Sequence, residues 1–137
     1  MDNHTKEQRR KNMQAVKNKD SAIELLLRHE LWHRGLRYQK NSSKVFGKPD
    51  IVFLGKKVAV FCDSEFWHGY DWEHKKEEIK SRRDFWIPKI ERNIDRDKEV
   101  NEKLMNDGWI VLRFWGNDIK KHLTECADTI ERTIKLR

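Results

Sequence analysis

Apolar side chains recur along the chain with two kinds of spacing, and each spacing predicts a type of secondary structure. The first helical repeat consists of Ile23, Leu26, Leu27 and Leu31. Asp20 and Ser21 precede this repeat as a good N-cap pair, and Gly35 follows it as a stop signal. We therefore expect a helix over residues 20–34.

Short apolar runs predict the strands of a sheet. Two runs rich in β-branched and aromatic residues occupy positions 50–54 and 58–62, and Gly55, Lys56 and Lys57 separate them. Such a pair of runs with a short glycine-containing connection is typical of a β-hairpin. Residues 36–40 form a candidate short strand before the hairpin, and the apolar residues 109–115 form a strand after it.

The second half of the chain predicts two more helices. One covers residues 84–107, with Pro88 either bending it or marking its start and Gly108 ending it, and the other covers 118–135. Segment 63–83 has no clean period, so we expect it to be mostly loop. The order helix, strand, strand, strand, helix, strand, helix is typical of an α/β or α+β fold, with a mixed central sheet flanked by helices.

The length of 137 residues suits a single domain. The first 19 residues are rich in Lys and Arg, so we interpret 1–19 as a basic N-terminal arm and 20–137 as the domain. We expect no membrane span, because no apolar run approaches the ~20 residues that a bilayer requires, and no secretory signal. Cys62 and Cys126 cannot form a disulfide framework, so a reducing cytoplasm is the expected location.

The charge of the chain favours a polyanionic partner only weakly. Lys and Arg total 30 against 23 Asp and Glu, which gives a formal net charge of +7. A positive net charge bears on nonspecific binding and not on fold or chemistry. Segments such as 73–78 mix both signs, so a solvated surface and a nucleic-acid-binding surface stay equally open on charge alone.

Acidic residues accompany the predicted hairpin. Asp50 opens a strand of apolar residues, either as a turn or cap before the strand, or as a ligand of a hard cation such as Mg²⁺. The hairpin brings Asp50 near Asp63, so these carboxylates, Glu65 and His68 are expected in or near one patch. Glu24 lies in the preceding helix, and considered on its own it is expected to be a solvated helix residue.

A histidine and several aromatic residues extend this patch. His68 is the side chain best suited to take a proton near neutral pH, although a lone histidine is more often a packing residue. Phe66 and Trp67 precede it, and Phe85 and Trp86 lie in a basic stretch. Exposed aromatic rings beside positive charge can stack on bases or wedge between them, whereas Phe85 is expected in the core.

Taken in order, these segments resemble a known family. The matching segments are Lys11-Asn12-Met13, Ser21-Ala22-Ile23-Glu24, Gly47-Lys48-Pro49-Asp50, Phe66-Trp67-His68, Phe85-Trp86, Lys89-Ile90, Asn93, Arg96-Asp97, Gly108-Trp109, Val111-Leu112 and Trp115. The sequence resembles the very short patch repair (Vsr) DNA mismatch endonucleases, which have the restriction-endonuclease-like or PD-(D/E)XK fold. Phe66-Trp67-His68 is a fairly unusual motif, and the ordered set is specific.

The resemblance implies roles for the polar residues. Asp50 matches the central metal-binding aspartate, Cys62 offers its backbone carbonyl to the metal, and Glu24 reaches the metal through water. His68 matches the general base of the family, and Asp97 matches the acid that orients it. Asp63 stands where the best-known members carry a second histidine, and it is included among the candidate catalytic residues.

The resemblance also implies how the protein holds DNA. The residues that match wedges inserted beside the mismatch are Met13, Phe66, Trp67 and Trp86. Lysines and arginines of the arm and of segment 75–96 are expected to grip phosphates, and the candidates are Lys11, Lys17, Arg82 and Arg83.

One family feature is absent from the sequence. Familiar members hold a structural zinc, and the corresponding positions here are Glu65, Tyr70, Trp72 and Asn117. Glu65 is the one good zinc ligand among them, so we expect no zinc, and packing of Tyr70 and Trp72 in its place.

The sequence therefore predicts a Mg²⁺-dependent DNA endonuclease that nicks one strand at or beside a T:G mismatch in DNA repair. The alternatives are a site-specific restriction or homing endonuclease of the same fold, and a non-catalytic DNA-binding module. An RNA-directed role is supported only by charge and aromatic content. The expected partners are mismatched double-stranded DNA and mismatch-repair proteins, for a monomeric protein associated with the nucleoid in the cytoplasm.

Overall fold

The computed structural model describes residues 21–137. The predicted basic arm lies outside the described residues, and with it Lys11, Met13 and Lys17. None of the described helices combines the length and the apolar character that a bilayer crossing requires.

A mixed four-stranded sheet forms the centre of the molecule, as the sequence predicts. Its strands lie in the order β1 (Gln39–Lys40), β2 (Ile51–Phe53), β3 (Val58–Asp63) and β4 (Ile110–Trp115). β1 pairs with β2 and β2 with β3 in antiparallel fashion, whereas β3 and β4 are parallel. A crossover of helices connects β3 to β4, because parallel neighbours cannot be joined by a tight turn.

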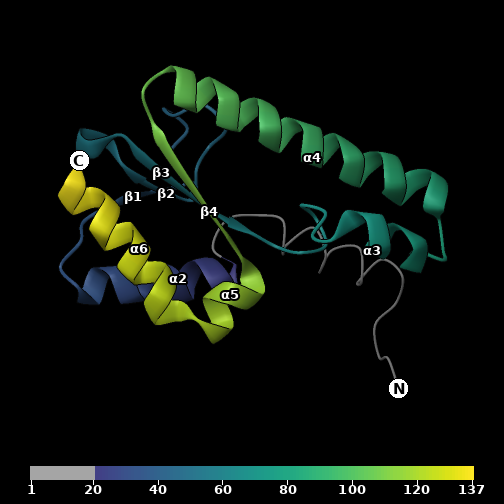
Figure 1. Cartoon of the computed structure of the whole chain (residues 1–137), viewed down its shortest axis with the longest axis horizontal. Helices are drawn as coiled ribbons and strands as arrows, with labels where there is room; N and C mark the ends of the chain where they lie inside the picture. Colours follow the sequence, from purple (N-terminus) through teal and green to yellow (C-terminus); the bar gives the residue numbers. More distant parts are fainter. Residues whose placement is uncertain (1–20) are drawn as a thin grey trace.

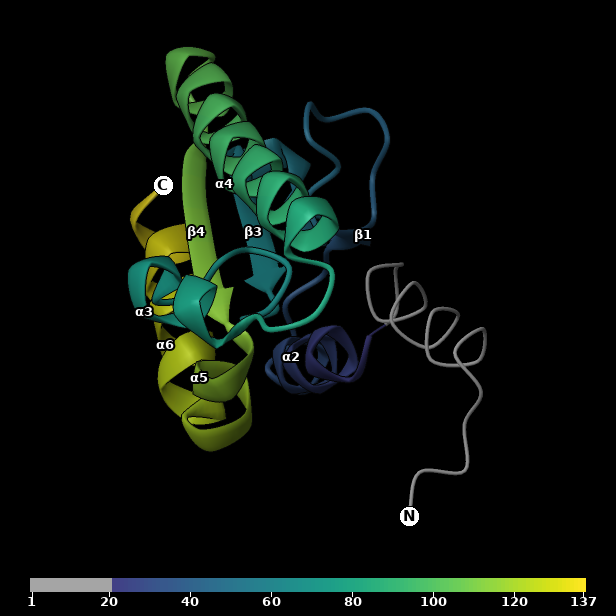
Figure 2. The same ribbon diagram turned by 90° about the vertical axis from the view of Figure 1, so that its right-hand side faces the viewer.

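Helices cover both faces of this sheet (Figures 1 and 2). α4 (Arg83–Asn106) lies over one face, and α2 (Ala22–His33), α5 (Gly116–Lys121) and α6 (Leu123–Leu136) lie over the other. Val100 and Leu104 of α4 pack on Ala59 and Phe61 of β3. The arrangement confirms the predicted α+β fold.

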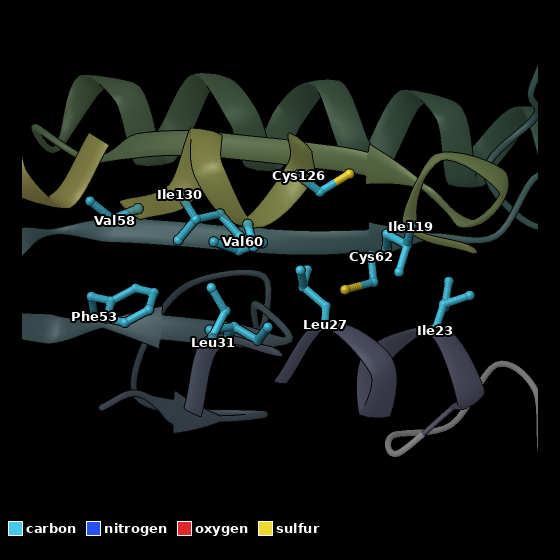
Figure 3. Close-up of a cluster of buried hydrophobic side chains, with 12 residues drawn as sticks. Ile23, Leu27, Leu31, Phe53, Val58, Val60, Cys62, Ile119, Cys126 and Ile130 are labelled. Carbon is cyan, nitrogen blue, oxygen red and sulfur yellow. The ribbon is translucent and has the colours of Figure 1, made fainter. Parts of the chain in front are cut away.

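The larger core lies between the sheet and α2. The Ser21 side chain caps this helix by accepting a hydrogen bond from the Glu24 N–H, and Gly35 follows its end at φ 82°. Leu27 and Leu31 point from α2 toward the sheet and are fully buried, where α6 also contributes its apolar side chains (Figure 3). The helical repeat in the sequence therefore marks the buried side of α2.

Several boundaries differ from the predicted ones. Only Gln39–Lys40 of segment 36–40 forms a strand. The hairpin connection is a short 3₁₀ turn, Leu54–Lys56, and its left-handed residue is Lys57 at φ 52° rather than Gly55. Helix 84–107 starts before Pro88, which lies inside α4, and the predicted helix 118–135 is two helices separated at His122.

The prediction of a loop over 63–83 is wrong in part, because this segment contains α3 (Trp72–Glu78). α3 has no buried residue, so it has no apolar repeat from which a sequence could reveal it. Its contacts with α4 hold it in place: Trp72 Nε1 donates to Glu91 at 3.2 Å, and Lys76 pairs with the same carboxylate at 3.2 Å.

The expectation that Phe85 belongs to the core is also wrong. Its side chain is 42% exposed in the first turn of α4. The Arg82 guanidinium lies 4.9 Å from the ring centroid, and Lys89 Nζ lies 5.4 Å from it. Phe85 is therefore a surface ring beside positive charge.

Candidate active site

A cleft of about 590 Å³ opens where β3 ends, between α2 and α4. Its lining brings together all the predicted catalytic and metal-binding residues, which are Glu24, Asp50, Cys62, Asp63, His68 and Asp97. These residues come from α2, the position just before β2, the end of β3, the loop after it and α4. The fold thus converts positions that are far apart in sequence into one site.

Asp50 is held at the start of the hairpin by its neighbour strand. One of its carboxylate oxygens accepts a hydrogen bond of 2.7 Å from the Cys62 N–H. Burial raises the pKa of Asp50 to about 7 against the lowering effect of that bond, and the charge of Glu24 adds to the rise. The bond explains why an aspartate directly precedes the apolar strand β2.

Glu24 lies in the first turn of α2 and is only 5% exposed, so it is not a solvated helix residue. Its side chain is hydrogen-bonded to that of Asp50. Two carboxyl groups in contact at a buried site need a proton or a cation between them, because their charges otherwise repel. Their oxygens are the ligand type that Mg²⁺ prefers.

His68 and Asp97 form a second pair in the cleft. His68 follows β3 in a loop, and its Nδ1 lies 2.6 Å from Asp97 Oδ2 on α4. Burial is the largest single effect on the pKa of His68 and lowers it, but the hydrogen bond to Asp97 and the charges of Asp63 and Asp97 together raise the pKa above its usual value. When the ring is neutral with its proton on Nδ1, Nδ1–H donates a hydrogen bond to the Asp97 carboxylate and Nε2 keeps its lone pair.

Asp63 completes the acidic lining, and its partner is a residue that the sequence prediction missed. The side chain of Asp63 is 7% exposed, and its oxygens accept from Arg113 Nη1 at 3.0 and 3.2 Å. Burial raises the pKa of Asp63, while His68 and Arg113 oppose that rise. Arg113 was detectable as the one charged residue within the apolar run 109–115.

A second group of side chains in the cleft also has the spacing of metal ligands. Ligand atoms of Asp63, His68 and Asp97 lie within 4.8 Å of one another. Arg113 already pairs with Asp63 and stands 3.6 Å from Asp97, so its positive charge opposes a metal ion there. Glu24 and Asp50 are the better oxygen donors for a cation.

The aromatic residues form a cluster next to the cleft. The Phe66 ring centroid lies 5.2 Å from that of Trp67 and 5.5 Å from that of Trp86, with edge-to-face geometry. Phe66 is 40% exposed, whereas Trp67 is 5% exposed and contacts the Lys89 ammonium. Phe66 is therefore accessible to a binding partner, whereas Trp67 is the buried member of the cluster.

Positive side chains surround the cleft. Arg82 is exposed at the start of α4, and the neighbouring Arg83 donates from Nη1 to carbonyls at the end of α3, including Lys76 O at 3.0 Å. Arg83 thus has a structural contact in addition to its predicted role. The lysines and arginines that line the cleft are Lys48, Arg96, Arg113 and Lys120. Arg96 belongs to segment 75–96, where phosphate contacts are predicted, whereas the sequence prediction assigned no role to the other three.

The four positions that correspond to zinc ligands in the family make protein contacts. Glu65 Oε2 accepts a hydrogen bond of 2.8 Å from the Asn117 N–H. The Tyr70 ring lies 5.0 Å from that of Trp115, and Trp72 is hydrogen-bonded to α4. These contacts join the loop after β3 to the end of β4 and to α4.

Comparisons with known proteins agree on one family. The sequence profile of the DNA mismatch endonuclease Vsr matches residues 1–74. A Type II nicking enzyme of Neisseria meningitidis serogroup C is 55% identical over 98% of this chain and 91% of its own length. A Type II nicking enzyme of Haemophilus parainfluenzae is 50% identical over 98% and 96%. The DNA mismatch endonuclease Vsr of Escherichia coli K12 is 34% identical over 83% and 72%.

The mixed sheet between helices, with an acidic cleft at its edge, defines a restriction-endonuclease-like nuclease. The profile covers more than half of the chain, and the relatives align along nearly all of it. The chain belongs to the Vsr DNA mismatch endonuclease family and is an endonuclease that nicks DNA.

Proposed function

We propose that this protein is a Mg²⁺-dependent endonuclease that nicks one strand of duplex DNA at or beside a T:G mismatch, in DNA repair. The observation that carries the proposal is the meeting of two pairs in one cleft. The carboxyl pair Asp50 and Glu24 is suited to a hard cation, and the pair His68 and Asp97 is suited to proton transfer.

Asp50 would hold the metal, with Glu24 acting through water and Cys62 through its backbone carbonyl. The position of Cys62 supports this set, since its N–H points to Asp50 and the N–H and C=O of a strand residue point to the same side. The thiol itself is not needed. A bound Mg²⁺ would polarise a phosphoryl oxygen and offset the negative charge that develops during hydrolysis.

His68 would act as the general base. Its Nε2 accepts a proton from water, the water oxygen forms a bond to phosphorus, and the P–O bond of the nicked strand breaks as its oxygen leaves. Asp97 keeps the Nδ1 proton in place, so that the free lone pair is on Nε2. Asp63 lies 3.6 Å from Nδ1 and adds negative charge beside the ring as the proton arrives.

The mismatch preference is proposed from the aromatic cluster. Phe66 and Trp86, assisted by Trp67 and by Met13 of the arm, would wedge into the duplex, which costs least where pairing is already weak. The phosphate contacts proposed for the arm and for α4 come from Lys11, Lys17, Arg82 and Arg83. The name of the Escherichia coli relative, a DNA mismatch endonuclease, supports the same target.

The wider setting of the protein is proposed on the same basis. We infer a basic arm over 1–19 followed by one endonuclease domain over 20–137, acting as a monomer on the nucleoid in the cytoplasm, alongside mismatch-repair proteins. The absence of a structural zinc stays a prediction, and the contact of Glu65 with Asn117 supports it.

A second candidate is a site-specific restriction or homing endonuclease of the same fold. The names of two relatives, Type II nicking enzymes, mention nicking but no mismatch, which keeps this candidate in view. The test compares nicking of matched and T:G duplexes that share one sequence, with and without Mg²⁺. Selective single-strand nicking of the T:G duplex is expected. Cleavage of the matched duplex alone, or cutting of both strands at a defined sequence, would favour the second candidate.

The alternative of a non-catalytic DNA-binding module is disfavoured by the relatives, which are named nicking enzymes and a mismatch endonuclease. Asp50→Ala should abolish nicking while the dissociation constant for the duplex is retained, because Asp50 serves the metal and not the DNA backbone. Nicking by Asp50→Ala at the rate of wild type would refute the assignment of Asp50 to the metal.

A further inference from the structure

Arg113 stands at the centre of a polar network and has no part of its own in the proposed mechanism. It lies opposite Phe61 in the parallel register of β3 and β4, and its guanidinium carbon is 3.9 Å from the centroid of the Phe61 ring. Its Nε donates to Asn101 Oδ1 on α4 at 2.7 Å. Arg113 therefore connects the sheet to the helix that carries Asp97.

The same guanidinium reaches both carboxylates that flank His68. Arg113 Nη1 lies 3.0 Å from Asp63 Oδ1 and 3.6 Å from Asp97 Oδ1. These two carboxylates lie 3.6 and 2.6 Å from the Nδ1 atom of the imidazole. One cation thus contacts both acidic neighbours of the candidate base.

We propose that Arg113 is a positioning residue, which holds Asp63 and Asp97 in place and thereby orients His68 for proton transfer. The inference rests on the proposed role of His68. It adds a residue to the site, and it gives Asp63 a function as the anchor of Arg113 on β3.

The chemistry of the guanidinium suits this role. Arginine is always charged and presents its N–H donors in a rigid plane, so that several acceptors are fixed relative to one another. Two buried carboxylates beside one imidazole repel each other unless a cation lies between them. Asn101 and Asp97 are one helical turn apart on α4, so one side chain of β4 restrains both.

Two other roles are open to an arginine in this position. It can serve only the stability of the fold, because removing one partner of a buried ion pair leaves an unpaired charge. It can also bind a DNA phosphate. The second role is disfavoured by its contacts, since Nε and Nη1 are already committed to Asn101 and Asp63 and the side chain is 17% exposed.

The experiment separates stability, binding and chemistry. We would measure the single-turnover nicking rate, the melting temperature and the dissociation constant without divalent metal for wild type, Arg113→Gln, and the doubly neutral Asp63→Asn/Arg113→Gln. The duplex is the one that wild type nicks fastest. The double variant leaves no unpaired buried charge at this pair, so it tests the role of Arg113 in a stable protein.

Arg113→Gln should lower the nicking rate by about 10- to 100-fold, with an unchanged dissociation constant. The double variant should regain melting temperature but not rate. Recovery of the rate together with the melting temperature would overturn the proposal, because the pair would then be structural. Weaker DNA binding at an unchanged maximal rate would overturn it in favour of a phosphate contact.

Two further variants complete the test. Arg34→Gln is a matched control, since Arg34 pairs with Asp128 at 2.6 Å and Glu131 at 3.1 Å between α2 and α6, away from the cleft. It should lose stability without a loss of rate. If His68→Ala nicks as fast as wild type, the assignment of His68 as the base is refuted. If His68→Ala is inert but Arg113→Gln nicks as fast as wild type, only the role proposed for Arg113 is refuted.

Discussion

Asp97 lies 2.6 Å from His68 Nδ1, and the proton in that contact decides which ring nitrogen can accept another. A carboxylate at this position accepts the Nδ1–H and stabilises the imidazolium that forms. An amide of the same shape offers less charge and can donate its own N–H, so the ring can adopt the other tautomer. The charge of Asp97 therefore matters beyond the space it fills.

Asp97→Asn should reduce the nicking rate by about 100-fold or more, which is the size of a general-base contribution. DNA binding and melting temperature should change little, because the side-chain volume is kept. Asp95→Asn on the exposed side of the same helix is the control and should nick as wild type does. Equal rates for wild type and Asp97→Asn would contradict the assigned orientation of His68.

At the scale of elements, the loop between β3 and α3 delivers His68 to the cleft. Gly69 follows the histidine in left-handed backbone, at φ +70°. A Cβ built on Gly69 would collide with Ile94 Cδ1 of α4, so the loop packs against the helix with no room for a side chain. The close approach of loop and helix therefore fixes where His68 meets Asp97.

Gly69→Ala should lower the free energy of unfolding by about 1–3 kcal/mol, from backbone strain and the collision with α4. It should also slow nicking, since the loop must move to relieve the contact and His68 moves with it. Gly55→Ala is the matched control, because nothing lies within 4 Å of its built Cβ and its φ is not positive. Denaturant unfolding and single-turnover nicking check both variants, and an equal response of the two would contradict the argument.

The elements also show how far the sequence alone predicts the fold. α2 was predictable because Leu27 and Leu31 follow a helical period and bury one face. α3 was not, because Trp72 and Lys76 hold it by polar contacts to Glu91, a residue distant in sequence. The break between α5 and α6 at His122 leaves no mark in the apolar pattern.

The candidate site divides in the same way. Asp50 and Asp63 were placed in one patch by the hairpin, which is a local feature. The contact of His68 with Asp97, and the burial of Glu24 beside Asp50, depend on how helices pack across the sheet, and only the family resemblance pointed to them. The role of Arg113 could not be predicted from the sequence, because its partners lie on other elements.

On the scale of the whole molecule, acidic and basic side chains occupy different places. The net charge is +7, yet the cleft is lined by the acidic residues already described. Arg82 stands outside the cleft at the start of α4, exposed and beside the ring of Phe85. Basic side chains around an acidic centre would attract the DNA backbone and leave the carboxylates of the proposed cation site available to a metal.

A basic side chain that contacts a DNA phosphate can be distinguished from one that only adds to the net charge. The salt dependence of the DNA affinity separates the two cases. Each phosphate contact contributes about −0.9 to the slope of log K against log salt, because counterions are released. Arg82→Gln should therefore make the slope about 0.9 less steep. Arg132 is exposed on α6, which packs on the sheet face opposite α4. Arg132→Gln removes the same formal charge and should leave the slope unchanged. Equal slopes for the two variants, measured by titration of a duplex over a salt series, would mean that only net charge matters and that Arg82 makes no phosphate contact.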